Sequence, residues 1–174
     1  PFTSGVVDAK KVETHDLGLI GAITGVRESA IAQTARAGVL PIVAPLGETS
    51  KGQILVVHAD AVARAIALAL KPHKVVFLNE AGGLIDGAGL VRSAVNLAED
   101  YAELSQSSGL DAESQRKLVE INTLLSDLPP TSSVSITSPE HLAKELFTHG
   151  GHGTLVRRGE KVVRHDDWSA IDND

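Results

Sequence analysis

Short apolar runs alternate with helix-forming segments between Gly38 and Phe147. Apolar runs of this length are typical of buried strands, and the segments between them carry helix start and stop signals. Such alternation predicts an α/β layer fold with a mostly parallel sheet. We predict strands at 39–44, 74–78, 134–137 and 155–157, and helices at 28–37, 59–70, 96–106, 112–128 and 141–147.

The segments around this alternation are less regular. Residues 1–15 are mixed and polar, and we expect a loosely held lead-in. Residues 17–26 predict extended structure that bends at its glycines. Residues 84–91 resemble a small hairpin with Asp86–Gly87 as its turn. The chain does not begin with Met, so we expect a fragment or a processed product.

Composition excludes several classes of function. The 174 residues suffice for one domain, with 43% hydrophobic and 22% charged residues, as in globular proteins. A net charge of −6 and an aromatic content of 3% argue against a nucleic-acid partner. The absence of Cys excludes disulfides, thiolate catalysis and Cys-ligated metals. No apolar run approaches the roughly 20 residues of a membrane span, so we predict no membrane segment.

The stretch from Gly52 to Leu70 consists of a short apolar run, a polar turn and an alanine-rich segment that we predict to be helical. Asp60 falls in the first turn of that helix, where exposed N–H groups and the helix dipole favour a carboxylate. A helix cap explains Asp60 without any chemistry, and a place in the capping region explains His58. Ligands of parallel α/β sheets bind beyond the carboxyl ends of strands, which points to the loops 45–58 and 79–83.

Two further features allow a functional interpretation. At about 100° per residue, Lys117 falls within the apolar arc of the helix 112–128. Its ammonium either reaches water at the border of that arc or binds an anion in a cleft. The glycines of Asn79–Gly83 either form a plain turn or let the backbone approach a nucleotide. Neither GxxxxGK[ST] nor GxGxxG occurs. His149 and His152 are too few for a metal site, and we predict none.

Taken together, several segments resemble the amino-acid kinase family, and within it the acetylglutamate kinases and bifunctional N-acetylglutamate synthase/kinases. The resemblance runs from about Asp16 to Arg164. It rests on Asp16–Gly21, Pro45–Gly47, Gly52–Leu55 followed by Ala59–Asp60, Phe77–Leu78 with Gly82–Leu84, Ser132–Ile136, and Ala143–Thr154. It implies a three-layer sandwich like that of carbamate kinase. Residues 1–164 would form the C-terminal half of the kinase domain, and 165–174 a tail or linker toward an acetyltransferase domain.

The resemblance implies phosphoryl transfer from ATP, with Mg²⁺, to the carboxylate of N-acetyl-L-glutamate in arginine biosynthesis. Asp60 matches the catalytic aspartate that orients active-site lysines. Lys117 matches the lysine that neutralises charge on the transferring phosphoryl group. The implied nucleotide site comprises Leu78, Asn79, Glu80, Ala81 and Gly82. The implied region for L-arginine, a regulatory inhibitor, comprises Glu145, Gly151 and Gly153.

The chain departs from the family where N-acetylglutamate binds. The usual Asn-Val-Asn-Ala-Asp is replaced by Val56-Val57-His58-Ala59-Asp60, and valine cannot donate the hydrogen bond of the first asparagine. The glycine-rich phosphate loop of the family's N-terminal half is also absent from these residues. Two functions therefore stay open, a kinase half and a kinase-inactive arginine sensor of an N-acetylglutamate synthase. Both imply a homo-oligomer, in the cytoplasm or, in a eukaryote, in mitochondria.

Overall fold

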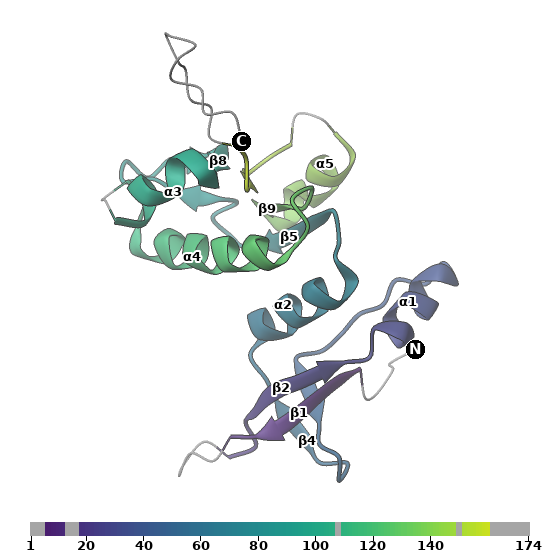
Figure 1. Cartoon of the computed structure of the whole chain (residues 1–174). Helices are drawn as coiled ribbons and strands as arrows, with labels where there is room; N and C mark the ends of the chain where they lie inside the picture. Colours follow the sequence, from purple (N-terminus) through teal and green to yellow (C-terminus); the bar gives the residue numbers. More distant parts are fainter. Residues whose placement is uncertain (1–5, 13–17, 107–108, 149–150, 161–174) are drawn as a thin grey trace, which may run out of the picture. The chain divides into compact units, whose positions relative to one another are not determined.

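The computed structural model describes residues 6–12, 18–106, 109–148 and 151–160. The chain divides into two compact units, Pro1–Pro72 and His73–Asp174, and each has a four-stranded sheet of its own (Figure 1). Each unit is α/β, which confirms the predicted class. Among the described helices, none combines the length and the apolar character that a membrane crossing requires.

The sheet of the first unit has the order β2-β1-β3-β4. β1 pairs antiparallel with β2 and parallel with β3, and β3 pairs antiparallel with β4. The core of this unit gathers around Leu55 of β4 and Val62 of α2. The elements are β1 (Val7–Lys11), β2 (Gly21–Val26), α1 (Glu28–Arg36), β3 (Leu46–Glu48), β4 (Ile54–Val56) and α2 (Ala59–Leu70).

Two predictions for the first unit are wrong. Residues 39–44 form no strand, and Leu40 and Ile42 are 81% and 77% exposed. A buried strand needs hydrogen-bonded neighbours, and no described strand pairs with this segment. Conversely, part of the expected lead-in forms β1. Val7 and Ala9 of this strand are buried and alternate with more exposed residues. The sequence did not reveal this alternation, because the stretch is short and polar.

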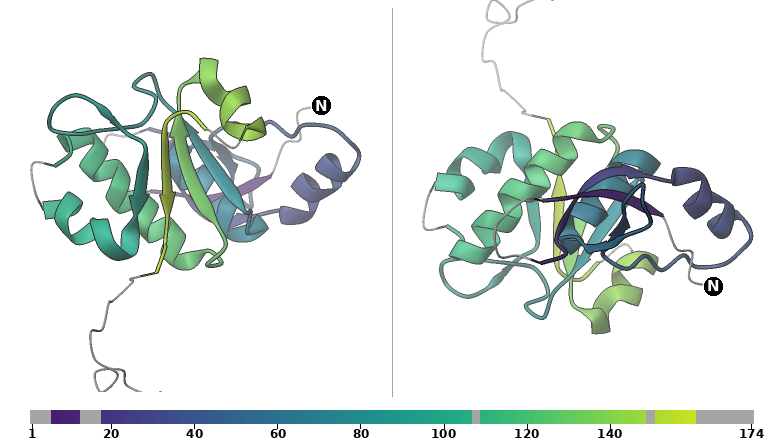
Figure 2. Two further views of the ribbon diagram at one scale, coloured as in Figure 1. Left: turned by 90° about the horizontal axis from the view of Figure 1, so that it is seen from above. Right: turned by 90° about the horizontal axis from the view of Figure 1, so that it is seen from below.

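The sheet of the second unit has the order β5-β9-β10-β8 (Figure 2). β5 pairs parallel with β9, β9 antiparallel with β10, and β10 parallel with β8, so the sheet is mixed. The elements are β5 (Lys74–Leu78), β6 (Leu84–Ile85), β7 (Val91–Arg92), β8 (Ala94–Asn96), α3 (Leu97–Gln106), α4 (Ala112–Asp127), β9 (Ser133–Thr137), the 3-10 helix η1 (Pro139–His141), α5 (Leu142–Phe147) and β10 (Thr154–Arg157).

Local signals account for most of these elements. Asp111 accepts a hydrogen bond from the Ser114 N–H at 2.7 Å and so caps α4 as predicted. The predicted hairpin is confirmed, because β6 and β7 pair around a turn at Asp86. Alternate β9 residues, Val134 and Ile136, are buried in the core of this unit, which also contains the apolar side chains of α4.

Candidate functional site

The carboxyl end of β5 and the start of α4 enclose a cavity of about 500 Å³. The loop after β5 contributes Asn79, Glu80 and Ala81, and α4 contributes Lys117. The loop residues and Lys117 are nearly forty positions apart in the sequence, and the fold brings them to the same cavity. The cavity lining is completed by Gly83, Leu84, Ile85, Asp111, Glu113 and Ser114.

The loop after β5 is held in shape by Asn79. Its backbone N–H donates to the Thr137 carbonyl at 3.1 Å, which extends the β5–β9 ladder by one residue. Its side-chain Oδ1 accepts the N–H of Gly82 at 2.7 Å, which closes a tight turn. Gly82 therefore shapes the turn without lining the cavity. Leu78 is 49% exposed and does not line it either.

Lys117 has a well-defined place on α4. Its ammonium lies 4.7 Å from the centre of the Phe77 ring and 3.0 Å from Glu120 Oε2, and its side chain is 25% exposed. The ammonium contacts the Phe77 ring and the side chain also lines the cavity, whereas binding of an anion by Lys117 stays a prediction. The sequence missed Ser114, whose buried hydroxyl accepts the Ile85 N–H at 2.8 Å and joins α4 to β6.

Asp60, Val56 and His58 belong to the first unit. Asp60 lies in the first turn of α2 as predicted, and His58 is the N-cap residue, without a side-chain capping bond. Val56 is 55% exposed, and its N–H already donates to the Leu19 carbonyl at 2.8 Å. His58 lines a separate cavity of about 460 Å³ between α2 and β2. The convergence of Asp60 with Lys117 stays a prediction.

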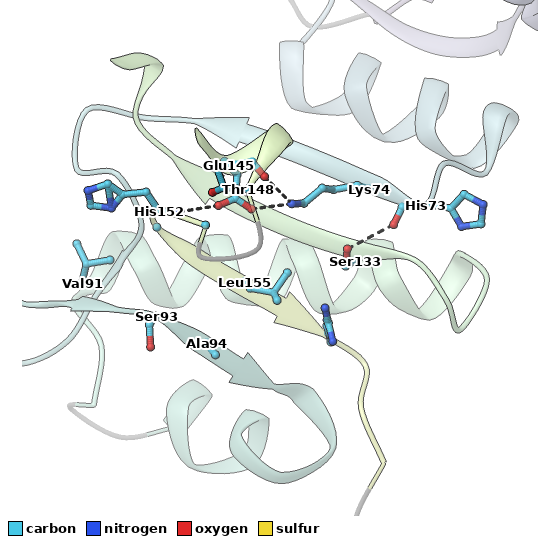
Figure 3. A pocket seen from close by; sticks show the side chains of 13 residues that line it. His73, Lys74, Val91, Ser93, Ala94, Ser133, Glu145, Thr148, His152 and Leu155 are labelled. Atoms are coloured by element: carbon cyan, nitrogen blue, oxygen red, sulfur yellow. Dashed lines mark hydrogen bonds and ion pairs between the residues drawn. The ribbon is translucent and has the colours of Figure 1, made fainter. Parts of the chain in front are cut away.

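A larger cavity, of about 860 Å³, lies on the second unit (Figure 3). Glu145, Gly151 and Gly153, the residues expected in an arginine region, all line it. Gly153 has φ +129°, and a Cβ there would overlap the Ile136 carbonyl oxygen. Gly151 has φ +37°, and a Cβ there would lie 2.8 Å from Glu145 Oε2. Gly153 therefore requires glycine, and a side chain at Gly151 would strain the backbone and displace Glu145.

Glu145 is the central charge of this larger cavity. It is only 7% exposed; its Oε1 lies 2.7 Å from Lys74 Nζ, and its Oε2 accepts the His152 N–H at 2.8 Å (Figure 3). Burial raises the pKa of this carboxyl, but the hydrogen bonds and the charge of Lys74 outweigh burial, so the pKa lies below its ordinary 4.5. Glu145 is therefore an ionised carboxylate at neutral pH.

Comparison with known proteins identifies the family. The model of the amino acid kinase family matches residues 2–123. The chain belongs to the amino acid kinase family. Within the described part of this family member, no three His, Asp or Glu side chains gather as they would around a metal ion.

Relatives of this amino acid kinase chain share much of its sequence. Acetylglutamate kinase of Xylella fastidiosa is 43% identical over 171 residues, which cover 98% of this chain and 41% of the relative. Protein arg-6, a mitochondrial protein of Neurospora crassa, is 46% identical over 162 residues, which cover 93% of this chain and 19% of the relative. The chain thus spans about two fifths or less of the length of these relatives.

A solved structure has the same fold. It is N-acetylglutamate synthase from Neisseria gonorrhoeae in complex with coenzyme A and L-arginine, with a TM-score of 0.75. The sequences are 20% identical, and the match covers 89% of this chain and 37% of that protein. This likeness supports the amino-acid kinase fold.

Proposed function

We propose that this chain is the nucleotide-binding half of an acetylglutamate kinase, which transfers phosphate from ATP to the carboxylate of N-acetyl-L-glutamate in arginine biosynthesis. The observation that carries the proposal is the cavity where Asn79, Glu80 and Ala81 meet Lys117. It lies beyond the carboxyl end of β5, where α/β sheets bind ligands. The 43% identity to the Xylella acetylglutamate kinase supports the choice of acceptor.

The residues of the cavity fit a nucleotide that carries Mg²⁺. Lys117 supplies the positive charge, while Glu80, Asp111 and Glu113 add negative charge to the lining. A bound Mg²⁺ would offset the charge of the phosphates and so reduce their repulsion by these carboxylates. Asn79 closes this turn, and in our proposal the turn presents its backbone to the nucleotide. In this proposal Leu78 and Gly82 support the nucleotide site from behind.

Phosphoryl transfer needs positioning and charge stabilisation more than covalent chemistry. In our proposal the Lys117 ammonium balances the charge that develops on the transferring phosphoryl group. Asp60 orients active-site lysines by its carboxylate. His58 takes the polar contact to N-acetylglutamate, since the side chain of Val56 can offer only apolar contact.

Nucleotide binding tests the proposal directly. Titration calorimetry with the ATP analogue AMP-PNP and Mg²⁺ should show binding that Lys117→Met weakens by roughly 10-fold or more, because a charged hydrogen bond to phosphate is lost. Arg116→Met is the matched control, since it removes the same charge one residue away, from an exposed side chain outside the cavity. Equal affinities of both variants would contradict the assigned role of Lys117.

The convergence of Asp60 and Lys117 can be tested separately. The chain has no cysteine, so a double variant with Asp60→Cys and Lys117→Cys carries only two thiols. We expect a short bismaleimide to join them within one chain. A pair that only long cross-linkers join would contradict a shared active site.

A second candidate function is an arginine-sensing domain of an N-acetylglutamate synthase. The observation in its favour is that Glu145, Gly151 and Gly153 line one cavity of about 860 Å³. In this candidate function a cationic ligand such as L-arginine would share the Glu145 carboxylate with Lys74 and the His152 N–H. Calorimetry with L-arginine separates the two candidates. Arginine binding without nucleotide binding supports the sensor, and nucleotide binding that Lys117→Met weakens supports the kinase half.

A further inference from the structure

Phe77 places an aromatic ring directly beneath the ammonium of Lys117. The distance from Lys117 Nζ to the ring centre is 4.7 Å, within the range of a cation–π contact. The chain has only three Phe, one Tyr and one Trp, so an aromatic ring at any given position is uncommon in this sequence. We propose that Phe77 is a positioning residue that holds Lys117 ready for the phosphates of the nucleotide. The inference rests on the proposed nucleotide role of Lys117.

The register of β5 puts this ring next to the nucleotide cavity. Phe77 pairs with Ile136 of β9 and precedes Asn79 by two residues, and strand residues two apart share a face. Asn79 continues the β5–β9 ladder and lines the cavity. The ring therefore lies on the face of β5 toward Lys117, one step behind the loop that would contact the nucleotide.

The second contact of the ammonium has a different consequence. Glu120 Oε2 lies 3.0 Å from Lys117 Nζ, three residues further along α4, and its side chain is 55% exposed. An exposed pair of this kind contributes little, and a glutamate that follows its lysine has the weaker orientation. Glu120 also places a negative charge beside the ammonium, where it would repel a phosphate.

An aromatic ring holds the ammonium without cancelling its charge. The four-carbon stem of lysine is flexible, so an unsupported ammonium would have to be ordered when the nucleotide binds. The Phe77 ring limits that freedom in advance, and because it is uncharged it does not repel a phosphate. A phosphate can then replace Glu120 at the ammonium while the ring stays in contact.

The test is a set of variants of the 174-residue chain, titrated with AMP-PNP and Mg²⁺. Phe77→Leu keeps an apolar side chain and removes the ring, and should weaken binding by about 3- to 10-fold. Phe77→Tyr keeps the ring and should bind as the parent does. In the Phe77→Leu background, Lys117→Met should cost less affinity than in the parent, because the two residues act together. Glu120→Gln should bind equally well or more tightly.

A spectroscopic measurement does not depend on affinity. The Phe77 ring should shift the NMR signals of the Lys117 ε-methylene group upfield, and the shift should vanish in Phe77→Leu and persist in Phe77→Tyr. The role of Phe77 would be overturned if Phe77→Leu bound AMP-PNP as tightly as the parent while Lys117→Met bound it more weakly. It would also be overturned if the parent showed no ring-current shift. Unchanged binding by Lys117→Met would instead overturn the nucleotide role of Lys117, and the inference with it.

Discussion

The pair between Glu145 and Lys74 should contribute measurably to the stability of the second unit. Glu145 is 7% exposed and accepts two hydrogen bonds, from Lys74 Nζ at 2.7 Å and from the His152 N–H at 2.8 Å. Glu145→Gln keeps the shape but turns an amide NH₂ toward one of these donors. A hydrogen bond to a charged group contributes about 1.5–3 kcal/mol. Because the Lys74 side chain is 34% exposed, water offsets part of the loss, and we expect a loss of about 2 kcal/mol in the free energy of unfolding.

Urea unfolding at pH 7 measures this loss. The matched control is Glu120→Gln, which neutralises a carboxylate that pairs with lysine at 3.0 Å but is 55% exposed. We expect the control to change the free energy of unfolding by less than about 0.5 kcal/mol. Equal unfolding midpoints for Glu145→Gln and the parent would refute the view that this pair stabilises the unit.

The same pair sets a pH dependence. The pKa of Glu145 is lower in the folded chain than its ordinary 4.5. Its contribution is therefore fully present above that value and is lost as pH falls through the lowered pKa. The difference between the parent and Glu145→Gln should be constant at neutral pH and shrink under acid conditions. A difference that grows on acidification would contradict the sign of the shift.

Two further predictions concern backbone geometry and capping. In a urea titration, Gly153→Ala should lower the free energy of unfolding by more than about 3 kcal/mol, because its Cβ would overlap Ile136. Gly89 has φ +82° and open space around it, so the control Gly89→Ala should lower the free energy of unfolding by only about 1 kcal/mol. Asp111→Ala should lower the melting temperature at pH 7, because it removes the cap of α4. The hydrogen bond from the Ser114 N–H lowers the pKa of the Asp111 carboxyl below its ordinary 3.8. The effect of the mutation should therefore fade as pH falls below that value.

Local sequence signals predicted the helices well. Asp111 marks the start of α4, and the alanine-rich run after His58 forms α2 over the predicted residues Ala59–Leu70. Capping bonds and apolar periodicity act within a few residues, so they can be read without knowledge of the fold. The hairpin around Asp86 follows from its turn residues in the same way.

Strands were less predictable because a strand depends on its neighbours. The apolar segment 39–44 has a strand-like composition but no partner among the described strands, whereas the polar-looking Val7–Lys11 forms β1 by pairing with β2 and β3. Pairing partners lie far apart along the chain, and their order follows from the packing of the whole unit. The antiparallel pair of β9 and β10 likewise was not evident from the alternation.

The sequence by itself determined the class of the fold, the helix boundaries and, through the family resemblance, the residues worth testing. Only the tertiary structure showed that Asn79, Glu80 and Ala81 share a cavity with Lys117, and that Phe77 lies beneath that ammonium. The physical reason is the distance along the chain over which each interaction acts. Capping and periodicity are local, whereas a cavity and a cation–π contact join residues that strand pairing and helix packing bring together.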